Sequence, residues 1–157
     1  MVKRGLYTIF TCLMLSATVL ITAQQVRATL GESAVSIQSD RNVLSAVERA
    51  KTVHDNFTVQ EIQSGSTTVR EYISPSGIVF GVAWNGLMRP DLTQLLGAYS
   101  NEYHEALRQI PHNRGRSRLD VKTNRVVVQQ WGHMRNLRGR AYVPSLIPSG
   151  VSVDEIR

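Results

Sequence analysis

The sequence predicts an α+β fold in which an antiparallel sheet of about five strands carries one long helix packed across a face. Three β-rich runs separated by turns precede a strongly amphipathic segment, and two further short β-rich runs follow it. Short strands joined by tight turns favour antiparallel pairing, because a parallel pair needs a long crossover connection. A single helix between the two groups of strands then has to cover the apolar face of the sheet.

The first three predicted strands lie at residues 57–62, 67–73 and 78–84, and turns around Gly65 and Pro75-Ser76-Gly77 separate them. Glycine, proline and serine are the residues that tight turns prefer. Neither face of the run 78–84 carries a charged side chain. A strand that is apolar on both faces is typical of the centre of a sheet.

The segment before these strands, residues 29–56, is predicted to be a lead-in that is extended or partly helical. Its first residues are small and polar. Asp40 is a candidate N-cap for a short helix that runs to Val53, because the apolar side chains between them recur at helical spacing.

The helix is predicted from Pro90 to the residue before Pro111. Pro90 suits the first helical position, and Asp91 places an acid in the first turn. Leucine, tyrosine and alanine side chains then recur every three or four residues and form one apolar stripe. Gly97 lies inside this stripe and costs a helix about 1 kcal/mol relative to alanine, which suggests close packing at that point.

After the helix, the sequence predicts a basic loop over residues 108–118 and then strands at 125–131 and 140–143, the second ended by Pro144. A bend between Gly132 and Gly139 separates the two strands. The tail, residues 151–157, is predicted to add a short edge strand.

The first 28 residues have the layout of a secretory signal peptide. Lys3 and Arg4 precede a run without ionisable acids or bases, and Val26-Arg27-Ala28 ends it with small residues at the two positions that a signal peptidase reads. We expect cleavage after Ala28 and a periplasmic or secreted protein. The alternative is an uncleaved N-terminal membrane anchor, since the apolar run 6–23 is near the lower length limit for spanning a bilayer.

Cleavage would leave the lead-in and one α+β domain over residues 57–157. The chain has one cysteine, Cys12, which lies in the signal segment. The mature chain then has neither a disulfide nor a thiolate, which excludes cysteine nucleophiles and cysteine–zinc sites.

Positive charge is concentrated in the C-terminal half. The formal net charge is +6, and residues 106–153 hold eight arginines and Lys122 against one acid, Asp120. Arginine suits two-pronged contacts with carboxylates and phosphates. The candidate binding residues are Arg114, Arg116, Arg118, Arg135, Arg138 and Arg140.

The partner expected for these arginines is an anionic envelope component (acidic polysaccharide, lipid phosphate or acidic protein) or another exported protein. Nucleic acid is not an expected partner of an exported chain. Contact with a membrane is expected only through the signal segment, if that segment is not cleaved. The alternative is a solvated surface without a partner. Five aromatic side chains either line a sugar or peptide groove or belong to the core: Trp84, Trp131, Tyr99, Tyr103 and Tyr142.

Catalytic motifs are weak. His104-Glu105 does not continue as a zinc-binding H-E-x-x-H motif, because Arg108 stands where the second histidine is needed. His133 is the candidate acid–base group or metal ligand, because it lies just past a strand end. Its possible partners are Glu71, Tyr72 and Asp91. The alternative is a histidine that bonds the backbone at a bend, and the sequence predicts neither a metal nor a cofactor.

Several short fragments follow one another along the chain in an order that is characteristic of one family. They are Leu30-Gly31, Val69-Arg70-Glu71-Tyr72, Phe80-Gly81-Val82-Ala83-Trp84, Pro90-Asp91-Leu92, Leu95-Leu96-Gly97-Ala98-Tyr99, Gly132-His133-Met134-Arg135, Gly139-Arg140-Ala141-Tyr142-Val143-Pro144, Gly150-Val151 and Glu155-Ile156-Arg157. Together they resemble the bacterial exported proteins grouped as domain of unknown function 2844. The resemblance covers nearly the whole chain after the signal segment. It implies one small exported domain and carries no activity, ligand or catalytic residue.

These observations favour an exported cell-envelope protein that acts as a non-catalytic binding or accessory module. It would contact an anionic partner through its arginine-rich C-terminal half. The alternative function is a small periplasmic hydrolase or metal-dependent enzyme that uses His133.

Overall fold

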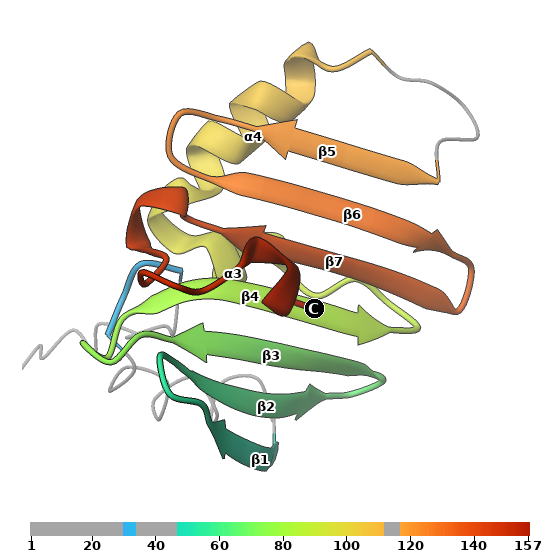
Figure 1. The fold of residues 1–157 in the computed structure, drawn as a ribbon. Coiled ribbons are helices and arrows are strands. Elements are labelled where there is room, and N and C mark those ends of the chain that lie inside the picture. Colours follow the sequence, from blue (N-terminus) through green and yellow to red (C-terminus); the bar gives the residue numbers. More distant parts are fainter. Residues whose placement is uncertain (1–29, 34–46, 112–116) are drawn as a thin grey trace, which may run out of the picture.

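The computed structural model describes residues 30–33, 47–111 and 117–157. In these residues one antiparallel sheet has seven strands in the order β1-β2-β3-β4-β7-β6-β5 (Figure 1). The expected mixed architecture, an antiparallel sheet with one long helix, is confirmed. The expected number of about five strands is wrong, because two strands come from segments in which the sequence suggested a helix and a loop.

The chain builds the sheet from two meanders. The first contains β1 (Val47–Val53), β2 (Thr58–Ser64), β3 (Thr67–Ile73) and β4 (Val79–Gly86); the second contains β5 (Arg118–Lys122), β6 (Val127–His133) and β7 (Asn136–Tyr142). β7 pairs with β4 and joins the two meanders at the centre of the sheet. As expected, β4 is buried along most of its length.

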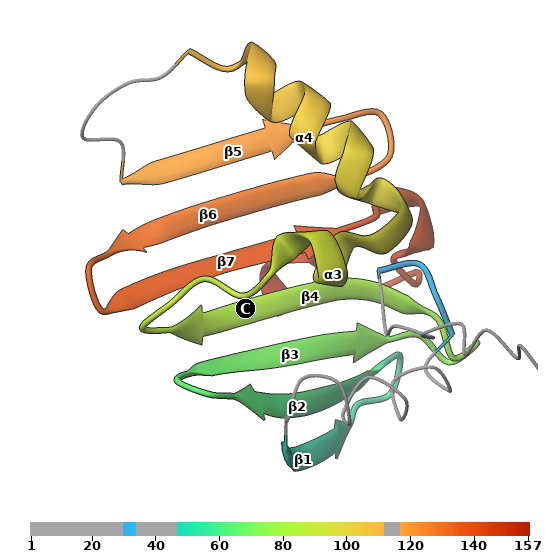
Figure 2. The ribbon, with the colours of Figure 1, turned by 180° about the vertical axis from the view of Figure 1, so that it is seen from behind.

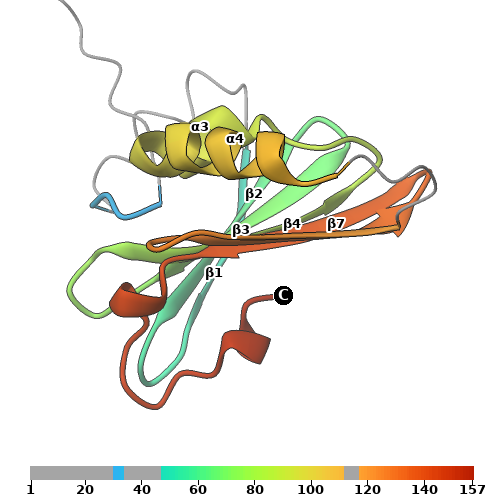
Figure 3. The ribbon, with the colours of Figure 1, turned by 90° about the horizontal axis from the view of Figure 1, so that it is seen from above.

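Two helices between the meanders, α3 (Leu92–Leu96) and α4 (Ser100–Gln109), cover one face of the sheet (Figure 2). The main core lies beneath them, where side chains such as Val82, Trp84 and Val128 meet Leu96 and Tyr103. Figure 3 shows the C-terminal segment on the opposite side of the sheet from the helices. That segment contains two 3-10 turns, η3 (Pro144–Leu146) and η4 (Val153–Glu155). We call the face opposite the helices the open face.

The predicted helix is present but broken. Asp91 caps α3, since its Oδ1 accepts a 2.9 Å hydrogen bond from the backbone N–H of Thr93. Gly97 has φ +49°, which ends α3, and a 3-10 turn, η2 (Gly97–Tyr99), leads into α4. Gly97 therefore interrupts the helix rather than packing inside it. Among the described residues, neither helix is long and apolar enough to cross a bilayer.

Three further expectations are corrected. The short helix expected to run to Val53 is instead strand β1 in its described part, paired with β2, because tertiary pairing overrides a weak helical pattern. The end of the basic loop is β5, in which Leu119 and Val121 alternate with charged residues. The tail forms η4 instead of an edge strand, because Ser152 and Glu155 form a reciprocal capping box around that turn. The lead-in thus contributes Leu30 and β1 to the same fold as residues 57–157.

Candidate binding site

The C-terminal segment covers part of the open face. Ile156 is fully buried and joins an aromatic cluster with Phe57, Tyr72 and Phe80. It lies directly over Gly81, where an added Cβ would come within 2.9 Å of the Ile156 side chain. Glycine at this position therefore lets the segment lie close against the sheet.

Two side chains on β3 hold the last residue in place. The Tyr72 hydroxyl donates to the backbone oxygen of Arg157 at 2.8 Å and accepts from the Arg157 backbone N–H at 2.9 Å. Arg70 donates to the same oxygen at 3.3 Å. Burial raises the pKa of Tyr72 above its ordinary value, although the hydrogen bond with Arg157 opposes that shift. The tyrosine is therefore a neutral anchor for the segment.

A row of two arginines and a tryptophan crosses the open face beside this segment. Trp131 on β6 pairs in register with Arg118 on β5 and with Arg138 on β7. The next residue in β6, Gln130, donates to Tyr103 of α4 at 2.8 Å and therefore points toward the helices. Since side chains alternate along a strand, Trp131 points the other way. We call Arg118, Trp131 and Arg138 the Trp131 row.

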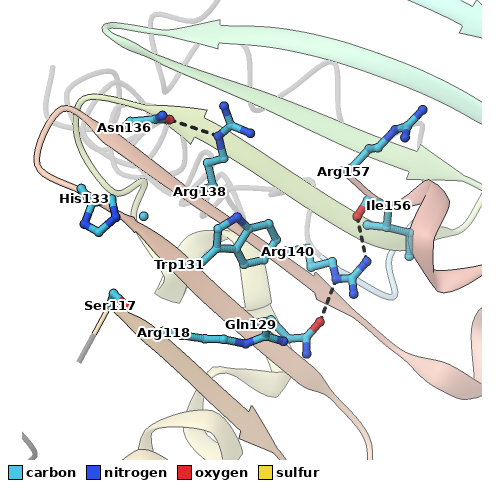
Figure 4. A pocket seen from close by; sticks show the side chains of 11 residues that line it. Ser117, Arg118, Gln129, Trp131, His133, Asn136, Arg138, Arg140, Ile156 and Arg157 are labelled. Carbon is cyan, nitrogen blue, oxygen red and sulfur yellow. Dashed lines mark hydrogen bonds between the residues drawn. The ribbon is translucent and has the colours of Figure 1, made fainter.

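The Trp131 row lines a hollow of about 650 Å³ on the open face (Figure 4). Gln129, His133 and Asn136 contribute side chains from β6 and β7, and Ile156 and Arg157 close the side formed by the C-terminal segment. No acidic residue of the described ranges lines this hollow. Its lining therefore combines guanidinium and amide donors with one large aromatic ring.

The arginines in the hollow have different roles. Arg140 donates to Gln129 Oε1 at 2.8 Å, to the backbone oxygen of Val153 at 2.8 Å and to that of Ile156 at 3.3 Å. Its side chain is 17% exposed. This arginine fastens the C-terminal segment to the sheet, so its donors serve the fold.

Arg118 and Arg138 are the accessible pair. The Arg118 side chain is 63% exposed, and its Nε donates to Asp120 at 3.0 Å. Arg138 is exposed, and its Nε donates to Asn136 Oδ1 at 3.0 Å. In both residues this hydrogen bond uses Nε, which orients the guanidinium group. The two Nη groups of each arginine are the donors that can meet a ligand.

The expected binding arginines are only partly brought together. Arg118, Arg138 and Arg140 line the hollow, whereas Arg135 lies in the β6–β7 turn with φ +70°. Arg114 and Arg116 lie outside the described residues. Gln129 and Arg157 were not among the expected binding residues, and Trp131 was expected either to line a groove or to belong to the core. Gln129 shares one strand face with Trp131 and His133, and this alternation was the signal for it, whereas nothing in the sequence indicated that Arg157 returns to the sheet.

The structure does not gather the groups that catalysis by His133 would need. His133 is exposed at the end of β6. Glu71 is 3% exposed and lies on β3 between Val69 and Ile73, so it faces the helix-covered side of the sheet. Asp91 caps α3 on that same side, away from His133. The described residues contain no cluster of three metal-ligating side chains. The third expected partner, Tyr72, holds the C-terminal segment.

Comparison with known proteins identifies the family of the chain. The model of a family described as protein of unknown function (DUF2844) matches residues 26–156. The chain belongs to this family. No curated protein and no solved structure matches the chain. The description of the family assigns no activity.

Proposed function

We propose that this DUF2844 protein is an exported, non-catalytic binding module of the cell envelope that holds an anionic partner on its open face. The observation that carries the proposal is the Trp131 row, which lines a hollow on the open face. In the described part of the chain, the side chains around this hollow are basic, amide, hydroxyl, imidazole or apolar groups. Sites that combine an aromatic wall with a few placed polar donors are typical of ligand recognition.

The export part of the proposal is supported by the N-terminal sequence. Basic residues, an apolar run and Val26-Arg27-Ala28 follow each other as in a signal peptide. The family match begins at residue 26, at the end of this segment. N-terminal sequencing of protein recovered from the periplasm or medium should start at Thr29. Material that starts at Met1 in a cytoplasmic fraction would contradict export.

The binding part is supported by the exposure of the arginines. Exposed guanidinium groups keep their donors available for carboxylate or phosphate oxygens and match such groups in a two-pronged manner. Trp131 is half-buried between them and offers a flat apolar surface. The ligand therefore needs both negative charge and an apolar or flat portion.

The two tryptophans of the chain provide a direct assay. Trp84 is 2% exposed beneath the helices, whereas Trp131 lies at the hollow. Addition of dextran sulfate, a soluble polyanion, should change the emission of Trp131 and leave that of Trp84 nearly constant. The change should disappear in Trp131→Phe. When the salt concentration is raised from about 0.1 M to about 1 M, the dextran sulfate concentration at the midpoint of the titration should rise, because the Debye length falls from about 10 Å to about 3 Å.

Charge-matched variants locate the binding. Arg138→Gln should weaken dextran sulfate binding, whereas Arg108→Gln should leave it unchanged. Arg108 is exposed on α4, which covers the other face of the sheet, so it controls for the loss of one positive charge. Equal weakening in the two variants, or affinity indifferent to salt, would show that the open face is not the binding surface.

A further inference from the structure

We infer that the anionic partner is an acidic glycan, a linear polysaccharide in which carboxylate-bearing sugars are separated by neutral ones, lying across the strands of the open face. This inference rests on the proposed function and specifies its ligand. Four features of the open face support it: its length, the pairing of its strands, the spacing of its charges, and the position of Trp131.

The first feature is a second hollow that continues the first. It has a volume of about 560 Å³ and shares Trp131, Arg138 and Arg157 with the hollow around the Trp131 row. Its lining reaches Ala50 and Thr52 on β1, whereas the first hollow reaches β5. Six strand spacings of about 4.8 Å separate β5 from β1. A groove of this length suits an extended oligomer better than one small anion.

The second feature is that the inner strands offer no free backbone edge. β2, β3, β4, β7 and β6 each pair with two neighbours, so their backbone groups are engaged within the sheet. An extended peptide usually binds a sheet by adding a strand at an unpaired edge. A ligand that crosses these strands is recognised by side chains, which favours a polymer rich in hydroxyl and carboxylate groups.

The third feature is that acidic residues accompany the arginines in the second hollow and beside the first. Glu61 and Glu155 line the second hollow, where Glu61 lies 2.9 Å from Arg70, and Asp120, which does not line the first hollow, lies 3.0 Å from Arg118. A nucleic acid carries a phosphate at every nucleotide and is bound by strongly basic surfaces. The sparse positive charge of this groove matches a chain whose carboxylates are separated by neutral units.

The fourth feature is the position of Trp131. The register places Arg118 and Arg138 one strand away on either side of it, so their backbones are about 10 Å apart across the row. That span is comparable with a disaccharide. A sugar ring stacked on the indole would place neighbouring carboxylates near the two guanidinium groups. Asn85, next to Arg138 in register, and Asn136 add amide groups for hydroxyls.

The test uses hyaluronan oligosaccharides, in which uronates alternate with neutral amino sugars, in calorimetric titration of the purified protein. The methyl-esterified oligosaccharide of the same length is the matched ligand control, because the methyl esters remove the charges of the uronate carboxylates. We expect the acidic form to bind and the esterified form to bind at least about tenfold more weakly, an effect of about 1.4 kcal/mol.

Protein variants separate stacking from charge. Trp131→Ala should reduce affinity at least about tenfold, whereas Trp131→Phe should retain most of it, because it keeps an aromatic surface. Arg138→Gln should reduce affinity, and Arg108→Gln should not. Circular dichroism tests whether each variant is folded. If Trp131→Ala does not fold, Arg138→Gln tests the role of the open face in glycan binding.

Two ligands represent the other classes of partner: oligothymidylate for nucleic acid and polyglutamate for acidic peptide. If either binds more tightly than the hyaluronan oligosaccharide and depends on Trp131, the glycan assignment is overturned while the proposed function stands. If none of these anions, dextran sulfate included, binds in a manner that depends on Trp131 or Arg138, the proposed function is overturned as well.

Discussion

Replacement of Arg140 by methionine should destabilise the protein, whereas the same replacement two residues earlier, at Arg138, should not. Both arginines lie on β7 and line the same hollow. Arg140 is 17% exposed and fastens the C-terminal segment, whereas Arg138 is exposed. Methionine preserves the apolar stem of each side chain and removes only the guanidinium group.

The magnitude follows from the contacts of Arg140. Hydrogen bonds from a charged group contribute about 1.5–3 kcal/mol each. Arg140 makes two at 2.8 Å and a longer one at 3.3 Å. Its ion pair with Asp154, at 3.6 Å, adds little because Asp154 is 91% exposed and solvent screens it. Since some acceptors regain water when the guanidinium group is removed, we expect Arg140→Met to cost about 3 kcal/mol.

Urea unfolding followed by circular dichroism measures the free energy of unfolding of both variants. A loss of about 3 kcal/mol corresponds to a Tm lower by about 10 °C for a domain of this size, and Arg138→Met should stay within about 0.5 kcal/mol of the parent. Equal unfolding midpoints for the two variants would refute the distinction between a structural and an accessible arginine. Binding of the anionic probe reports the complementary effect, since Arg138→Met should weaken it while the fold is intact.

Three further substitutions test the packing and the buried tyrosines. Ile156→Ala should cost about 2–4 kcal/mol by urea unfolding, because the side chain is fully buried; an unchanged midpoint would mean that the C-terminal segment does not pack on the sheet. Gly139→Ala should cost about 1–3 kcal/mol, because the added Cβ would overlap the Trp84 ring; a stable variant would contradict that close approach. Burial raises the pKa values of Tyr72 and Tyr103 in the folded protein above 10.0, because it favours the neutral hydroxyl. The stability that these neutral tyrosines contribute is therefore fully present below pH 10, and it is lost as the pH rises through their pKa values in the folded protein. Unfolding between pH 9 and pH 12 should show this decline, and Tyr103→Phe should make it shallower; an identical slope would refute it.

The strands with a clear sequence pattern were predictable. β3 was expected at residues 67–73 and is found there, because an alternating β-rich run is bounded by two turns. β4 was recognised as central from its uncharged faces, and the structure confirms that it has a neighbour on each side. The helix was recognised from its apolar stripe, although Gly97 divides it.

The strands at the two edges of the sheet were missed for different reasons. The apolar residues leading into β1 also fit helical spacing, so only pairing with β2 decides its conformation. β5 alternates Leu119 and Val121 with charged residues, a period of two that the surrounding arginines obscured. A basic composition thus drew attention away from a regular strand pattern.

The role of each arginine could not be predicted. Arg138 and Arg140 have the same chemistry, the same strand face and nearly the same position in the sequence. They differ because residues 153 and 156 return to the sheet and place backbone oxygens over Arg140 alone. Such a contact depends on the tertiary path of the tail, which local sequence patterns do not encode.

The central pairing of β4 with β7 has a consequence for how the chain acquires its fold. A polypeptide is synthesised from its N-terminus, so the first four strands emerge well before their later neighbour. Until Asn136–Tyr142 arrives, the largely apolar β4 presents one open hydrogen-bonding edge, which is a site for wrong association with other chains. Folding of this protein is therefore expected to benefit from a holding chaperone that shields this strand during synthesis.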